Sequence, residues 1–96
     1  MAVYVDDLVN YGTGKGYWKD RKSCHLIADS IEELIEFAVS IGLQKSWFQP
    51  KSSPHFDLDE EKRILAIENG AIELGRIELV KKLQEIRANN IPLESL

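Results

Sequence analysis

The stretch "CHLIADSIEELIEFAVSIG", residues 24–42, decides the fold because it holds the clearest strand and the clearest helix of this 96-residue chain. Its first five residues have the composition and the alternation of a short strand. Residues 24, 26 and 28 then share one face, while His25 and Ile27 lie on the other. Polar residues follow at once, and after them the apolar residues change to helical spacing. The stretch therefore predicts a strand that leads directly into a helix.

The helix in this stretch has a clear beginning and a clear end. Ser30 occupies an N-cap position, and Glu33 three residues later completes a capping box. Apolar residues then recur on one helical face, namely Ile31, Leu34, Ile35, Ala38 and Ile41. Gly42 tolerates the left-handed conformation that often follows a helix. We expect a helix from Ser30 to about Ile41.

Further elements lie on both sides of this stretch. Residues 2–6, "AVYVD", predict a strand whose last residue, Asp6, is followed by a second carboxylate, Asp7. Residues 46–49, "SWFQ", fit either a strand or a loop. A second helix is expected over about 58–69, capped by Asp57 with Glu60 and closed by Asn69-Gly70.

The C-terminal part of the chain begins with "AIELG", residues 71–75, which is either a short strand or the start of the last helix. That helix follows over residues 76–90. Its apolar residues Ile77, Val80, Leu83 and Ile86, or neighbours of these, are expected along one side.

This order of elements predicts an α/β fold, in which a small sheet of three to four short strands is packed by three helices. An α+β arrangement with a mixed sheet is the alternative. The chain is long enough for one core, so residues 1–90 are expected to form a single globular domain and residues 91–96 a short tail. A core of this size favours association into a homo-oligomer.

Charge and cysteine content limit the class of protein. The net charge of −4 excludes a protein that coats duplex nucleic acid, because such binding needs a broad basic surface. A single cysteine forms no intrachain disulfide and fits a cytoplasmic location. The N-terminal residues have neither the charge pattern of a secretion signal nor the length of a membrane span, so no membrane association is expected.

A basic, glycine-rich segment, "NYGTGKGYWKDRK" at residues 10–22, is the first candidate for ligand binding. It matches neither the P-loop nor the dinucleotide fingerprint. Its backbone N–H groups and basic side chains can still hold a phosphate-bearing small molecule, and nearby aromatic rings can stack on a base. The alternative is a solvated surface loop. The predicted ligand-binding residues are Asp7, Gly14, Lys15, Gly16, Tyr17, Arg21, Lys22, Trp47 and His55.

Two histidines and the carboxylates near them are the candidates for acid–base chemistry. The candidate catalytic residues are Asp6, His25, His55 and Asp57. Imidazole titrates near neutrality, and a neighbouring carboxylate can orient it. Along the chain His25 precedes Asp29, and His55 precedes Asp57. Their spacing is not diagnostic of a metal site, so the sequence assigns no metal ligand and identifies no cofactor.

Three ordered motifs resemble one known family. "MAVYVDDL", "SCHLIADSIEELIEFAVSIGL" and "WFQ…SSPHFDL…KRILAIENGAIEL" are similar to the small bacterial and bacteriophage family called domain of unknown function 4031, over about residues 1–75. The resemblance implies recurring polar positions at Asp6, Asp7, His25, Asp29, His55 and Asp57. It implies no reaction, because the family has no assigned activity.

Three functions follow from these patterns. The leading interpretation is a small cytoplasmic accessory protein, compatible with a phage origin, that binds and sequesters a phosphate-bearing, nucleotide-like ligand. The first alternative is a metal-assisted phosphoester hydrolase, with Asp6, Asp7, His25 and Asp57 as candidate ligands or acid–base groups. The second is a protein-interaction subunit without a small ligand. Whether the chain is an enzyme stays open at this point.

Overall fold

A four-stranded mixed sheet forms the centre of the molecule. The computed structural model describes residues 2–9, 22–50 and 54–89, with the strand order β3-β2-β1-β4. The antiparallel strands are β1 (Val3–Val5), β2 (Cys24–Ala28) and β3 (Phe56–Leu58). The short strand β4 (Ile72–Glu73) runs parallel to β1. The predicted small sheet with three helices is confirmed, and its pairing is the mixed one.

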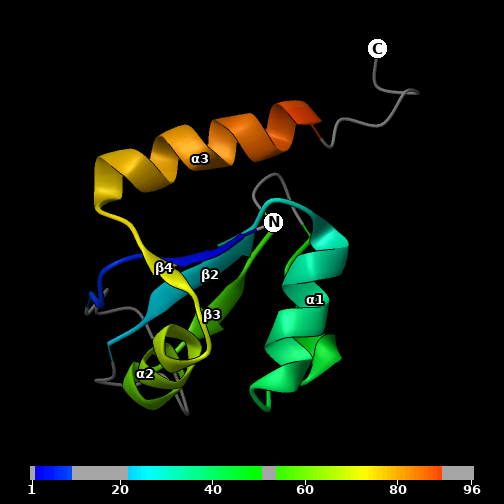
Figure 1. Cartoon of the computed structure of the whole chain (residues 1–96), viewed down its shortest axis with the longest axis vertical. Coiled ribbons are helices and arrows are strands. Elements are labelled where there is room, and N and C mark those ends of the chain that lie inside the picture. Colours follow the sequence, from blue (N-terminus) through cyan, green and yellow to red (C-terminus); the bar gives the residue numbers. More distant parts are fainter. Residues whose placement is uncertain (1, 10–21, 51–53, 90–96) are drawn as a thin grey trace.

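The three helices lie on two sides of this sheet (Figure 1). They are α1 (Ile31–Ser40), α2 (Glu60–Glu68) and α3 (Arg76–Asn89), and a short 3-10 helix, η2 (Lys45–Trp47), lies between α1 and β3. Helices α1 and α2 pack on one face of the sheet, and α3 packs on the other. The sheet is therefore the middle of three layers.

The bounds of β2 and α1 follow from local chemistry. Strand β2 covers the predicted residues, and the Ser30 hydroxyl oxygen accepts a hydrogen bond from the Glu33 backbone N–H at 3.2 Å. The same hydroxyl donates to Glu33 Oε1 at 3.1 Å, so the capping residues bind each other through their side chains. Gly42 has a φ of 95°, as expected for the residue that ends this helix.

One local prediction is wrong, and one open alternative is decided. The N-cap of α2 is Asp59, whose carboxylate accepts from the Lys62 backbone N–H at 2.9 Å, whereas Asp57 lies within β3. Asp57 matched the capping pattern in spacing alone, because any acidic residue three positions before another gives the same pattern. Of the two alternatives for the "SWFQ" segment, the strand is excluded: the segment holds the last two residues of η2 and one isolated bridge from Gln49 to His55. The strand after α1 is β3 instead.

The larger core lies between the sheet and helices α1 and α2. Its buried residues are Val5, Cys24, Leu26, Ala28, Leu34, Ala38, Ile41, Leu43, Phe56, Leu58, Ala66 and Ala71. Those core residues that belong to β2 and β3 occupy alternate positions of the strands, so the next positions along each strand point to the opposite face. The odd-numbered residues of β2 and β3 therefore share the face that carries α3.

A smaller core joins α3 to that opposite face. Tyr4 and Ile27 of the sheet are buried against Leu79 and Ile86 of α3. The predicted apolar side of α3 is partly wrong, because Ile77 and Val80 are 73% and 50% exposed. The helix turns Leu79, Leu83 and Ile86 toward the sheet instead.

In the described ranges, no helix has both the length and the apolar character needed to cross a membrane. Cytoplasmic location and homo-oligomer formation stay predictions. The predicted tail, residues 91–96, lies outside the described residues.

Candidate metal centre

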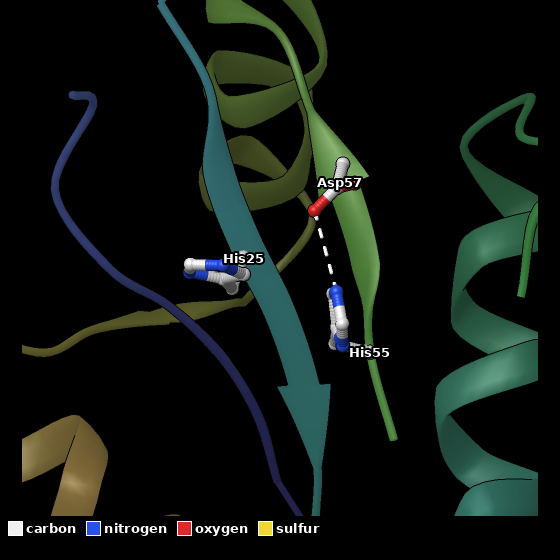
Figure 2. Close-up of side chains that lie close together, drawn as sticks. All are labelled: His25, His55 and Asp57. Carbon is white, nitrogen blue, oxygen red and sulfur yellow. Dashed lines mark ion pairs between the residues drawn. The ribbon is translucent and has the colours of Figure 1, made fainter. Parts of the chain in front are cut away.

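The pairing of β2 with β3 brings two histidines and a carboxylate together. In this antiparallel pair His25 is the direct partner of Asp57. His55 lies two residues before Asp57 and therefore points to the same face. Figure 2 shows the three side chains side by side on this face, with α2 behind the sheet. We call His25, His55 and Asp57 the His-His-Asp cluster.

The cluster has dimensions close to those of a metal site. One ligand atom from each residue can be chosen so that all three lie within 4.8 Å of one another. His55 Nε2 lies 3.4 Å from Asp57 Oδ1, and the rings of His25 and His55 pack edge to face at 5.2 Å. Ligand atoms about 2.1 Å from a tetrahedral ion lie about 3.4 Å apart, so His55 and Asp57 already have this spacing.

The three side chains are only half-buried. The exposed fractions are 33% for His25, 20% for His55 and 35% for Asp57. The three side chains of the cluster are therefore accessible from solvent. Both a metal ion and a ligand bound to it can reach these groups.

Asp6 holds His25 through two separate contacts. Its Oδ1 accepts a hydrogen bond from the His25 backbone N–H at 2.6 Å, and its Oδ2 lies 2.8 Å from His25 Nδ1. The carboxylate thus takes the place that a backbone carbonyl has in a regular antiparallel pair. The carbonyl of Asp6 instead accepts from Arg63 Nε at 2.8 Å. Asp6 is buried, with 7% of its surface exposed.

Gln49 holds the other half of the cluster. Its side-chain Nε2 donates to Asp57 Oδ2 at 2.6 Å, and its backbone exchanges two hydrogen bonds with His55. The pKa of Asp57 is lowered, mainly by the hydrogen bond from His55, against the opposing effect of burial. The Gln49 hydrogen bond and the charge of His25 lower it further. Asp57 is therefore anionic at neutral pH.

Cys24 lies next to His25 in the chain but does not belong to the cluster. Its side chain is fully buried on the opposite face, in the larger core. Burial is the main reason why the pKa of its thiol is raised to about 12. The thiol is thus a core group and neither a nucleophile nor a metal ligand.

Comparison with known families agrees with the three sequence motifs. A family model described as protein of unknown function (DUF4031) matches residues 3–86. The chain belongs to this family. The match confirms the resemblance and extends it into α3. No curated protein and no solved structure matches the chain.

The structure of this DUF4031 protein brings all four candidate catalytic residues into one group. Asp6 contacts His25, and His25 lies opposite Asp57 beside His55. Two further carboxylates that the family resemblance singled out, Asp7 and Asp29, have other surroundings. Asp7 is exposed, and Asp29 accepts hydrogen bonds from the Ala2 backbone N–H and the Tyr4 hydroxyl.

Most of the predicted ligand-binding residues are not described. Gly14, Lys15, Gly16, Tyr17 and Arg21 lie outside the described residues. Lys22 and Trp47 are exposed. Binding of a phosphate-bearing molecule by this segment stays a prediction.

Sequence reasoning missed two residues that support the cluster. Gln49 pairs with His55 through an isolated bridge, and Arg63 on α2 reaches the carbonyl of Asp6 and the carboxylate of Glu73. No sequence pattern indicated Gln49, because its role depends on a backbone pairing that only the folded chain creates. One weak signal could have pointed to Arg63: it is a basic residue that directly follows the acidic first turn of α2.

Proposed function

We propose that this protein is a metal-assisted hydrolase that acts on a phosphoester, with a divalent ion held by His25, His55 and Asp57. The observation that carries the proposal is the convergence of these three groups within 4.8 Å. Two imidazoles and one carboxylate suit zinc, manganese, iron or cobalt. Magnesium and calcium prefer oxygen ligands and fit this set less well.

Three protein ligands are the usual number in a catalytic zinc site, where a further position stays open for water or substrate. A divalent ion in such a site supplies a Lewis acid and lowers the pKa of a bound water. The contribution of the chain is to hold the ion and to leave the site accessible. The partial exposure of all three side chains meets the second requirement.

The choice of a phosphoester rests on the charge near the cluster in the sequence. The whole chain carries a net charge of −4, yet Lys15, Lys19, Arg21 and Lys22 lie within eight positions, and the last of them is three residues before His25. A local group of positive charges attracts an anionic substrate. A phosphate group can also bind a metal ion directly, so one ligand satisfies both features.

A second candidate function uses the same site without cleavage. The glycines of residues 10–16 favour a backbone cradle for a phosphate group, which is a binding feature and no sign of catalysis. In this version the protein sequesters a nucleotide-like molecule through the basic segment and the bound ion. The two candidates differ only in whether a product appears.

The experiment begins with protein that has been treated with a chelator and then supplied with Zn²⁺ or Mn²⁺. Bis(p-nitrophenyl) phosphate serves as the probe, and release of p-nitrophenol is measured. We expect hydrolysis that depends on the added metal and is lost in Asp57→Asn. The matched control is Asp29→Asn, which changes a carboxylate of the same domain that hydrogen-bonds Tyr4 and Ala2. Metal binding without turnover would favour the sequestering protein, and absence of metal binding would contradict both versions.

A further inference from the structure

We infer that Asp6 is a positioning residue that fixes His25 Nε2 as the metal-binding atom of the cluster. The inference rests on the metal site of the proposed function and deepens it. Asp6 lies outside the His-His-Asp cluster and acts through His25. Its role is to choose which of the two ring nitrogens faces an ion.

The contacts of Asp6 limit the orientation of His25. One carboxylate oxygen binds the backbone N–H of His25, and the other binds the ring Nδ1 of the same residue. A side chain held at both its own backbone and its ring has little freedom to rotate. Binding through two oxygens therefore fixes the position of the ring before any metal arrives.

The same contact also sets the tautomer of the ring. An ionised carboxylate has no proton to donate, so the hydrogen between it and Nδ1 belongs to the imidazole. In a neutral imidazole with its proton on Nδ1, the lone pair is on Nε2. Metal-binding histidines commonly donate their other ring N–H to a carboxylate in this way.

The backbone of Asp6 is held by a further contact, with Arg63. Arg63 Nε donates to the Asp6 carbonyl at 2.8 Å, and Arg63 also forms an ion pair with Glu73 of β4 at 3.0 Å. The Arg63 side chain is only 15% exposed. This contact ties the end of β1 to α2 and β4, so the carboxylate of Asp6 is presented from a fixed backbone.

The test is Asp6→Asn, which keeps the size of the side chain. The amide oxygen can still accept from the His25 backbone N–H, and the amide nitrogen then faces Nδ1 as a donor. We expect the ring proton to move to Nε2 and the affinity for Co²⁺ to fall about 10- to 100-fold. Asp29→Asn is the matched control, since Asp29 also accepts two hydrogen bonds, one from a backbone N–H and one from a side chain.

Two measurements separate this inference from the proposed function. Nitrogen-15 NMR of the histidine rings in metal-free protein reports the tautomer, and Co²⁺ titration followed by visible absorption reports affinity. A proton on Nδ1 in the wild type, together with weaker Co²⁺ binding in Asp6→Asn but not in Asp29→Asn, supports the inference. Equal Co²⁺ affinity of Asp6→Asn and wild type overturns it.

The nitrogen-15 NMR spectrum of the wild type tests the inference even if the Asp6→Asn variant does not fold. A His25 ring with its proton on Nε2 in the unmodified chain overturns the inference by itself. If the wild type binds no Co²⁺, the metal site of the proposed function fails, and the inference that Asp6 selects a ligand atom fails with it. A proton on Nδ1 would then show that the failure lies in the metal site and not in the contact with Asp6.

Discussion

Neighbouring residues of the same strands have different roles on the two faces of the sheet. Cys24, Leu26 and Phe56 are buried under α1 and α2 in an apolar layer. His25 and Asp57, each next to one of them in the chain, lie half-buried on the other face. Helix α3 packs on that second face at Tyr4 and Ile27. The second face therefore has an apolar end under α3 and a polar end that holds the cluster.

This contrast explains how a chain of 96 residues can carry a polar cluster and still fold. Alternation in a strand assigns each residue to one face, so a polar residue on one side leaves the packing on the other side intact. The free energy of folding comes mainly from the larger core. The Asp6 carboxylate supports the cluster through its contact with the His25 ring, and Gln49 supports it by donating a hydrogen bond to Asp57. The cluster displaces no residue from that core.

The largest expected effect separates two adjacent residues, Phe56 and His55. Phe56 is 1% exposed and packs against Phe48, with the ring centres 5.7 Å apart. Phe56→Ala should lower the free energy of unfolding by about 3–5 kcal/mol, because it leaves a cavity in the larger core. His55→Ala should cost much less stability and abolish Co²⁺ binding. Urea unfolding and Co²⁺ titration of both variants check this, and equal destabilisation by the two would remove the distinction between the faces.

The next comparison concerns Cys24 and pH. Its thiol has a pKa of about 12 in the fold, above the usual 9.0, because it is buried. Above pH 9 the unfolded chain loses this proton while the folded chain keeps it, so folding becomes less favourable. The expected slope is about −1.4 kcal/mol per pH unit up to the folded pKa. Urea unfolding between pH 8 and 11 should show this slope in the wild type relative to Cys24→Ala, and parallel curves would contradict it.

The sequence predicted those elements whose determinants are local. Ser30, Glu33 and Gly42 fixed the ends of α1, and alternation fixed β2. Strand β3 has only three residues, and it exists because it pairs with β2 about thirty positions earlier. No local pattern reveals such a pairing. The spacing of Asp57 and Glu60 was therefore interpreted as a helix cap.

The candidate site could be predicted in its residue types but not in its arrangement. Histidines and carboxylates were chosen for their chemistry, and four of them do lie together. Which carboxylate binds which histidine depends on strand register: Asp6 contacts His25, although Asp29 is closer to His25 in the sequence. Gln49 has no distinctive chemistry, and only its backbone bridge to His55 places it beside Asp57.

A smaller effect is expected at Gln49. Replacing this residue tests how much its hydrogen bond to Asp57 contributes to the cluster. Gln49→Ala removes the hydrogen bond to Asp57 Oδ2 and keeps the backbone bridge to His55. We expect about a 10-fold loss of Co²⁺ affinity, because the carboxylate is less well oriented. Isothermal titration calorimetry measures it. Gln44→Ala is the control, since Gln44 is exposed and its side-chain oxygen accepts a hydrogen bond from the Ser46 hydroxyl, away from the cluster. An equal loss of Co²⁺ affinity in this control would contradict the role of Gln49.

The smallest effect is expected in acid, at Asp57 itself. The hydrogen bond from His55 holds the pKa of Asp57 below the ordinary 3.8 in the folded chain. Its contribution to stability is therefore fully present above pH 3.8 and is lost as the pH falls through the folded value. In metal-free protein, the difference in unfolding free energy between wild type and Asp57→Asn should shrink as the pH falls below about 4. Because Asp57 is partly exposed, solvent screens this effect, and it should be smaller than the alkaline effect of Cys24. A larger acid effect would mean that the cluster stabilises the fold as strongly as the buried face does.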